Sequence, residues 1–81
     1  MYYPSIIYSD SIDKYYVGHT HNLELRLNRH NLGWTTSTTS GIPWRYVCNE
    51  SYPTKSLANS REREIKKWKS RKLIEQLIGI E

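Results

Sequence analysis

What this 81-residue chain lacks narrows the classes to which it can belong. It has one cysteine, Cys48, so it cannot form an internal disulfide, which is typical of proteins from a reducing compartment. No apolar run approaches the ~20 residues that a membrane-spanning helix needs. The first residues, MYYPSIIYSD, lack the basic region and the cleavage site of a signal peptide. We therefore expect a cytoplasmic protein with no membrane partner.

Phenylalanine is absent too, although the chain has ten aromatic residues, seven tyrosines and three tryptophans. These side chains can stack on nucleobases or fill a small core. We find no internal repeat and no linker. A chain of this length forms one domain, 1–81, whose core is too small to enclose a large pocket.

Positive charge is concentrated near the C-terminus. The formal net charge of the chain is +4, whereas residues 61–72 contain seven basic and two acidic residues, a net charge of +5. The basic residues are Arg61, Arg63, Lys66, Lys67, Lys69, Arg71 and Lys72. Such a surface is typical of proteins that bind a nucleic-acid backbone. A solvated helix with interspersed Glu and Lys has the same composition, so charge alone does not separate these interpretations.

Three strands are predicted. Residues 2–9 and 15–19 are rich in β-forming residues and are separated by the turn DSIDK, which indicates a hairpin. Because Pro4 has no backbone N–H, we expect the first strand to begin after it or to lie at a sheet edge. The polar loop GWTTSTTSG precedes the third strand, IPWRYVCNES. The residues expected on one face of that strand are Trp44, Tyr46 and Cys48.

Three helices complete the predicted order ββαβαα. The first begins after Thr20 or Asn22 and ends near His30, with Gly33 beyond its end. The second is capped by Thr54 and ends near Lys69, and its apolar residues are Leu57, Ala58, Ile65 and Trp68. The third is capped by Ser70, closed by Gly79, and carries Leu73, Ile74, Leu77 and Ile78. The fold class is α/β (α+β), a small sheet covered by helices.

Two polar residues share the inward face of the first helix. At about 100° per residue, Leu23, Leu27, Arg26 and His30 fall in one arc, which leaves Leu25 exposed. A charged side chain on the inward face needs a partner or a cleft, because burying an unpaired charge is costly.

On the second helix, Glu62 and Glu64 lie on opposite shoulders of the apolar stripe. A carboxylate beside a basic cluster is what a one-metal phosphodiester site needs, since Mg²⁺ is often held by one or two carboxylates with phosphate and water. A helical glutamate that pairs with Lys or Arg four residues later is the alternative, and geometry does not choose between them. The three histidines lack metal-ligand spacing, and nothing resembles a nucleophile elbow.

Several motifs follow one another along nearly the whole chain. They are IIY near the start, YYVG at 15–18, L-x-x-R at 23–26, H-N at 30–31, GIPW at 41–44, TKS at 54–56, R-E-x-x-I-K-K-W at 61–68 and SRK at 70–72. In this order they resemble the GIY-YIG nuclease superfamily, and more closely its small single-domain bacterial branch. The resemblance implies a three-stranded antiparallel sheet flanked by helices. It also implies an endonuclease that hydrolyses DNA with Mg²⁺ or Mn²⁺ and no small-molecule cofactor.

The resemblance also implies a role for each matching residue. Tyr16 would act as general base or position the attacking water, and Arg26 would stabilise charge on the phosphate. Glu62 would be the metal ligand, assisted by His19 and His30. The residues predicted to contact the nucleic-acid backbone are Arg63, Lys66, Lys67, Lys69, Arg71 and Lys72.

The chain departs from the family pattern at two places. Ser5 stands where the first name motif has a tyrosine, with Tyr3 and Tyr8 as nearby substitutes, and Ser5→Tyr is expected to raise a weak activity. The loop 34–40, WTTSTTS, has no charge where relatives are basic, so a shallower salt dependence of binding is expected.

Two other classes of function remain. The first is a nucleic-acid-binding module on the same fold with impaired catalysis, and the second is a structural or protein-interaction domain. The sequence does not choose between duplex DNA, branched or structured DNA and RNA, and it does not give the oligomeric state.

Overall fold

The structure is a computed structural model in which residues 1–79 are described. The strands are β1 (Tyr3–Ser9), β2 (Lys14–Thr20) and β3 (Trp44–Asn49). The helices are α1 (Leu23–Asn31), a 3₁₀ helix η1 (Thr36–Gly41), α2 (Lys55–Trp68) and α3 (Arg71–Ile78). The predicted order and fold class are confirmed, and the polar loop after α1 contains the additional 3₁₀ helix.

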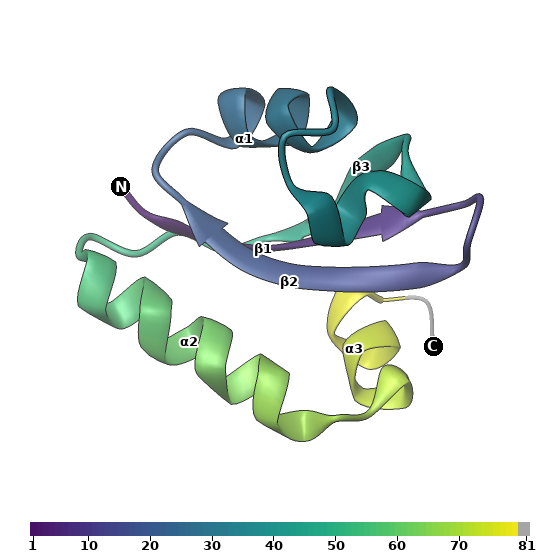
Figure 1. The fold of residues 1–81 in the computed structure, drawn as a ribbon. Helices are drawn as coiled ribbons and strands as arrows, with labels where there is room; N and C mark the ends of the chain where they lie inside the picture. Colours follow the sequence, from purple (N-terminus) through teal and green to yellow (C-terminus); the bar gives the residue numbers. More distant parts are fainter. Residues whose placement is uncertain (80–81) are drawn as a thin grey trace.

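The sheet is antiparallel with strand order β2-β1-β3, so β1 is the central strand (Figure 1). The expectation for Pro4 is wrong, because Pro4 lies inside β1, opposite His19 of β2. Its carbonyl accepts a hydrogen bond from the Glu50 N–H at 3.0 Å, beyond the last β1–β3 pair. The N and O atoms of a strand residue point to the same side. The missing N–H of Pro4 therefore faces a position past the end of the β3 ladder.

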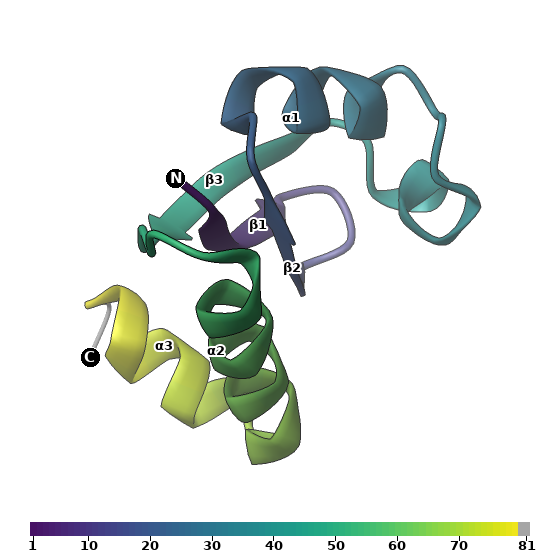
Figure 2. The same ribbon diagram turned by 90° about the vertical axis from the view of Figure 1, so that its left-hand side faces the viewer.

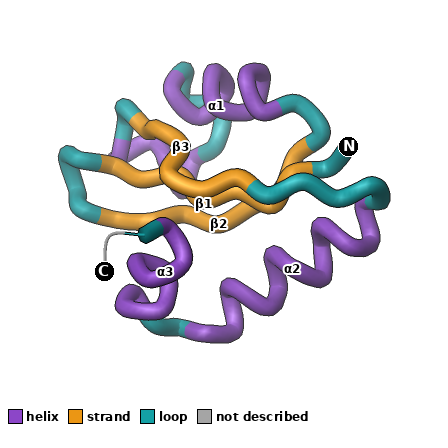
Figure 3. The backbone as a smooth tube through the Cα atoms, turned by 180° about the vertical axis from the view of Figure 1, so that it is seen from behind, coloured by secondary structure: helices purple, strands orange, loops and turns teal. Residues whose placement is uncertain are grey.

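Helices cover both faces of the sheet. α1 lies over one face, while α2 and α3 lie over the other (Figures 1 and 3). The core on the α2 side is built on Ile6, Val17 and Ile65. On the α1 side, Ile7 and Trp44 are buried. Each face of the sheet thus has its own hydrophobic core.

A β-bulge divides β3 between these two faces. Cys48 pairs with Ile6, whereas Tyr46 pairs with Ile7, so Val47 is an extra residue between them. The prediction that Trp44, Tyr46 and Cys48 share one face is therefore wrong, because Cys48 packs against the α2-side core. Tyr46 faces α1, where its hydroxyl donates to the Leu23 carbonyl at 2.7 Å.

Predicted caps set the helix boundaries. Asn22, rather than Thr20, caps α1 by accepting from the Leu25 N–H at 3.0 Å. The predicted caps of α2 and α3 are confirmed, and Gly79 ends α3 with a φ of 86°. Leu25 is exposed as expected, but Leu57 and Leu73 are also largely exposed, so the apolar stripes of α2 and α3 are narrower than predicted.

None of the helices in residues 1–79 has both the length and the apolar character needed to cross a membrane.

Candidate active site

The predicted catalytic residues gather at the free edge of β2, which lies between α1 and α2 (Figure 2). Side chains of a strand alternate between the two faces of the sheet. Tyr16 and Gly18 face α1, where the Tyr16 ring meets the His30 ring edge-on, with 5.6 Å between centroids. His19 faces α2 and contacts Glu62. The edge of β2 is thus where groups from both helical layers meet.

Arg26 lies directly over the backbone of β2. A Cβ atom added to Gly18 would be 2.4 Å from Nη2 of Arg26, so only glycine leaves room for the guanidinium. Within residues 1–79, no side-chain hydrogen bond or ion pair involves this guanidinium. Its donors are therefore available to an anion at the strand edge.

His30 is buried and hydrogen-bonded to the loop that follows α1. Its Nδ1 lies 2.8 Å from Oγ1 of Thr38, and that hydroxyl donates its own proton to the Thr35 carbonyl at 3.1 Å. In the arrangement where the Thr38 hydroxyl donates to Thr35, its oxygen accepts from His30, which places the imidazole proton on Nδ1 and leaves a lone pair on Nε2. Burial, with a smaller contribution from the charge of Arg26, lowers the pKa of His30. The imidazole is therefore neutral at physiological pH.

The uncharged loop after α1 holds this histidine in place. Thr38 is fully buried, and its carbonyl also accepts from the Trp44 indole N–H at 2.7 Å. Thr38 therefore holds both the His30 ring and the Trp44 ring in position. The polar composition of 34–40 thus has a structural reason.

The lowered pKa of His30 predicts how stability changes with pH. As the pH falls below the ordinary histidine value of 6.5, the unfolded chain binds a proton at His30 before the folded chain does. The free energy of unfolding should therefore decrease from about pH 7 to about pH 5, by no more than about 1.4 kcal/mol per pH unit for one proton. This pH range lies above the pH range in which carboxyl groups are protonated.

Urea denaturation at several pH values measures this slope. His30→Gln should flatten it, whereas His21→Gln, at an exposed position, should not. An unchanged slope in His30→Gln would show that another group is responsible.

Glu62 is the carboxylate that reaches the β2 edge. It accepts from Nδ1 of His19 at 2.5 Å and from Nζ of Lys66 at 2.9 Å, and its side chain is 13% exposed. Burial acts to raise the pKa of Glu62, but the hydrogen bonds from Lys66 and His19 outweigh it and hold the pKa below its ordinary value. Glu62 is therefore ionised at neutral pH.

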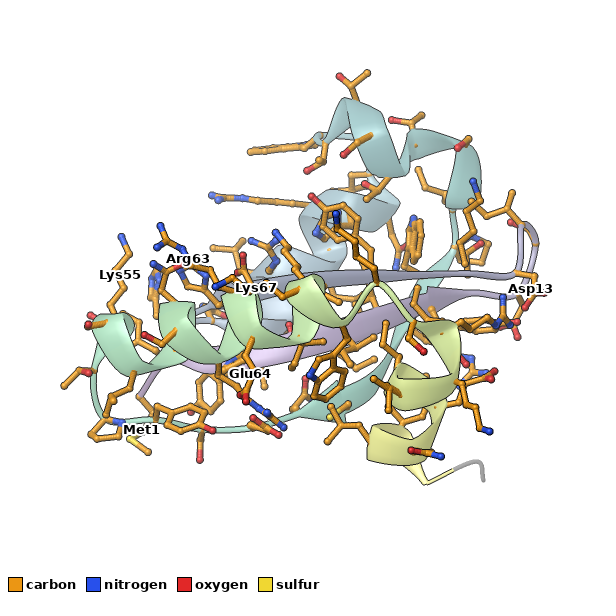
Figure 4. The ribbon with its side chains drawn as sticks, turned by 90° about the horizontal axis from the view of Figure 1, so that it is seen from below. Met1, Asp13, Lys55, Arg63, Glu64 and Lys67 are labelled. Atoms are coloured by element: carbon orange, nitrogen blue, oxygen red, sulfur yellow. The ribbon has the colours of Figure 1, made fainter. Side chains whose placement is uncertain are left out.

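Glu64 lies on the other side of α2. Its side chain is 59% exposed and accepts from Arg61 at 2.6 Å, while Arg61 also holds Glu50. Figure 4 shows Glu64 on the opposite side of the helix from Lys55 and Arg63. The structure therefore separates two glutamates that helical geometry alone could not.

The donor set at Glu62 suits a metal ion that keeps most of its ligands as water and phosphate. No group of three or more His, Cys, Asp or Glu side chains in residues 1–79 could form a metal cage. A single ionised carboxylate fits Mg²⁺ or Mn²⁺, which need few protein ligands, and does not fit a structural zinc site. Lys66, which binds Oε2 of Glu62, is about half exposed, so a metal ion could take its place at this oxygen.

A groove of about 390 Å³ lies at the β2 edge and is lined by both Arg26 and His19. Its lining residues are Tyr2, His19, Thr20, His21, Arg26 and Lys55, none of which is acidic. Lys55 was not among the predicted site residues, because it lies outside the basic segment 61–72 and only the packing of α2 against β2 brings it there.

The predicted backbone-binding residues divide into two groups. Arg63, Lys67, Lys69 and Lys72 are exposed, and none of them forms an ion pair within the described chain. Lys66 pairs with Glu62, and Arg71 pairs with Asp13 and Glu75. Arg71 therefore ties α3 to the β1–β2 turn.

A family model described as the GIY-YIG catalytic domain matches residues 2–75. The chain belongs to the GIY-YIG family. This is a family of nucleases that act on DNA. Searches of the curated proteins and of the solved structures found no match.

In this GIY-YIG domain, the serine in place of the first motif tyrosine has a large neighbour. Ser5 is 3% exposed and lies opposite Gly18. Burial raises the pKa of the Tyr46 hydroxyl, while the charge of Arg26 and a hydrogen bond with Ser5 oppose this rise. The Tyr46 hydroxyl, which donates to the Leu23 carbonyl, therefore lies on the same side of the sheet as Ser5.

Tyr46 was not among the predicted site residues, because its approach to Ser5 depends on β3 lying beside β1. Of the two substitutes suggested by the sequence, Tyr8 lies on the opposite face of the sheet, bonded to Asp13. The only signal in the sequence was the small residue itself, since a short side chain in a packed core requires a large neighbour.

The gain in activity expected for Ser5→Tyr stays a prediction, and the hydrogen bond between Ser5 and Tyr46 adds a second prediction, on stability. A second phenol at position 5 would compete with Tyr46 for the same volume, so the variant should lose about 1–3 kcal/mol of stability. The double variant Ser5→Tyr/Tyr46→Leu should recover that loss. Urea denaturation measures both, and a single variant as stable as the wild type would contradict the packing argument.

Proposed function

We propose that this GIY-YIG domain is a divalent-metal-dependent endonuclease that cleaves DNA at the β2 edge. The observation that carries the proposal is that a guanidinium with no side-chain partner in residues 1–79 and an ionised carboxylate both lie at the β2 edge. Arg26 reaches this edge from the α1 layer and lines the groove, and Glu62 reaches it from the α2 layer through its contact with His19, which also lines the groove. In this proposal the phosphodiester lies in the groove against Arg26, and the metal ion held by Glu62 approaches it past His19.

Each side chain has a defined task in this proposal. Two guanidinium donors of Arg26 bind two phosphate oxygens and stabilise the charge that develops on them. Tyr16 positions the attacking water, and Nε2 of the neutral His30 is free to accept its proton. The P–O bond to the leaving group then breaks, and solvent returns a proton to the leaving oxygen.

Glu62 would hold the metal ion, with Lys66 displaced from its outer oxygen. When bound, the ion supplies a Lewis acid for the phosphate and leaving oxygens. Because Glu62 is ionised, Nδ1 of His19 is the donor in their contact, so Nε2 of His19 faces away from the carboxylate. His19 orients the carboxylate in this arrangement.

A nucleic-acid-binding module with impaired catalysis is the second candidate. It is favoured by one observation, the presence of Ser5 in place of the motif tyrosine. Both candidates use the same groove and the exposed basic residues of α2, so only an activity measurement separates them.

The test is a nicking assay on supercoiled plasmid with Mg²⁺ or Mn²⁺ and an EDTA control. Arg26→Ala should lower the rate by about 10²–10³-fold, the typical effect of losing a charge-stabilising donor. Arg45→Ala is the matched control, because Arg45 lies on the opposite edge strand and pairs with Asp10.

Cleavage that persists unchanged in Arg26→Ala would indicate a contaminating nuclease and refute the proposal. Salt-sensitive binding without cleavage in either metal would favour the binding module.

A further inference from the structure

Trp34 is an exposed tryptophan in a fixed position. It is 68% exposed, whereas Trp44 is 5% exposed. Gly33, with a φ of +82°, turns the chain at the end of α1, and the Trp34 N–H then donates to the Arg29 carbonyl at 3.0 Å. The backbone of Trp34 is therefore anchored to α1, although its indole is in solvent.

One face of this indole is already covered by a cation. The Arg29 guanidinium lies 5.0 Å from the ring centroid, a cation–π contact that orients the ring. Since most of the residue remains exposed, the opposite face is open. An aromatic ring with one supported face and one open face is the arrangement on which a nucleobase stacks.

Next to Trp34 is a pocket of about 200 Å³ that is suited to an anion. Its lining residues are Thr20, His21, Asn22, Leu25, Arg26, Arg29, His30 and Thr35, none of which is acidic. Arg26 also lines the groove at the β2 edge. A positively charged path therefore leads from the proposed cleavage position to the chain neighbour of Trp34.

We propose that Trp34 stacks on an unpaired nucleobase next to the cleaved phosphodiester, with the adjoining phosphate held in the Arg26–Arg29 pocket. The substrate class is then DNA with a single-stranded segment at the cut, as in a flap, a branch or an overhang. A base within a duplex is stacked on both faces and cannot offer one to Trp34. This inference rests on the proposed nuclease function, which places the cleaved phosphate at Arg26.

The uncharged loop agrees with this substrate. A loop that follows a duplex backbone gains affinity from Lys and Arg, through release of counterions. Here the loop 34–40 has none, and it begins with an aromatic ring instead. The loop can therefore contact a nucleobase through Trp34, whereas it has no basic side chain with which to bind the backbone of a second strand.

The test compares binding of two fluorescein-labelled oligonucleotides by anisotropy in EDTA, where no cleavage occurs. One is a blunt duplex, and the other is the same duplex with a single-stranded flap. Trp34→Ala should weaken flap binding about tenfold, in line with the ~1–3 kcal/mol of one stacked base, and leave duplex binding unchanged. Trp34→Phe, which keeps a ring, should retain most of the affinity.

Leu32→Ala is the matched control, because Leu32 is an equally exposed apolar neighbour, at 72%. If Leu32→Ala weakens flap binding as much as Trp34→Ala, the patch is a general apolar surface, for example for a protein partner, and the proposal is overturned. Equal losses on flap and duplex, or no loss on either, overturn it too.

This experiment is independent of catalysis. Trp34-dependent flap binding in a protein that cuts nothing would support the stacking site while refuting the nuclease function. Metal-dependent cleavage that is equally fast on flap and duplex, and unchanged in Trp34→Ala, would overturn the stacking site and leave the nuclease function intact.

Discussion

Replacing Glu62 with glutamine is expected to lower metal-dependent cleavage by about 10³-fold. The variant keeps the size of the side chain but removes the charge that would hold the cation. Loss of the ion forfeits several kcal/mol of charge stabilisation, and each ~1.4 kcal/mol is a factor of ten in rate. Initial rates of plasmid nicking at saturating Mg²⁺ and Mn²⁺ measure the effect.

Glu64→Gln is the matched control on the same helix. Glu64 pairs with Arg61 on the far side of α2, so its charge should not affect the rate. DNA binding in EDTA should survive in Glu62→Gln, because the variant removes a negative charge from the edge of a basic groove. Equal rates for Glu62→Gln and the wild type would exclude Glu62 as the metal ligand.

Gly18→Ala is expected to lower the cleavage rate by about 10²-fold and to leave the fold intact. The added Cβ would lie 2.4 Å from Nη2 of Arg26, and the guanidinium, as the end of a flexible side chain, can move away at little cost. A displacement of about 1 Å at a catalytic group can lower the rate by about 10²-fold. We therefore expect a loss of that size in plasmid nicking and a nearly unchanged urea midpoint.

Gly41→Ala should have the opposite effect. There the added Cβ would lie 2.4 Å from the buried Trp44 ring, which has no free end to move. Overpacking of this kind costs about 1–3 kcal/mol, so stability should fall. A Gly18→Ala variant that is destabilised as much as Gly41→Ala would show that Gly18 has a structural role and not a positioning one.

Features fixed by neighbouring residues were predictable from the sequence. The caps Asn22, Thr54 and Ser70 each accept from the N–H three residues later, a contact that depends on local chemistry alone. Helical periodicity likewise placed Arg26 and His30 on the inward face, and His30 is indeed buried.

Features fixed by distant pairing were not predictable. Pro4 was expected at a sheet edge, but β3 pairs with β1 and makes β1 the central strand. Pro4 lies just beyond the end of the β1–β3 ladder. The extra residue Val47 shifts the alternation of β3 and sends Cys48 to the other face. Neither the strand order nor the bulge can be predicted from the pattern of a few neighbouring residues.

The candidate site also combines features fixed by neighbouring residues with features fixed by distant contacts. Helical geometry left Glu62 and Glu64 equivalent, and the choice of Glu62 came from the family resemblance. Packing of α2 against the sheet brings Glu62 to His19 of β2 and leaves Glu64 on the other side of the helix. Tyr46 and Thr38 were not predicted as site residues, because tertiary contacts bring their hydroxyls to Ser5 and to His30.

The separate cores on the two faces of the sheet have a consequence for how the protein can vary. Arg26 and His30 belong to the layer packed on Ile7 and Trp44, whereas Glu62 belongs to the layer packed on Ile6 and Ile65. In the proposed reaction, a substitution in one core would therefore alter phosphate recognition and leave cation affinity unchanged, and a substitution in the other core would do the reverse. The two halves of the proposed reaction would then evolve independently, because the three-stranded sheet separates their cores.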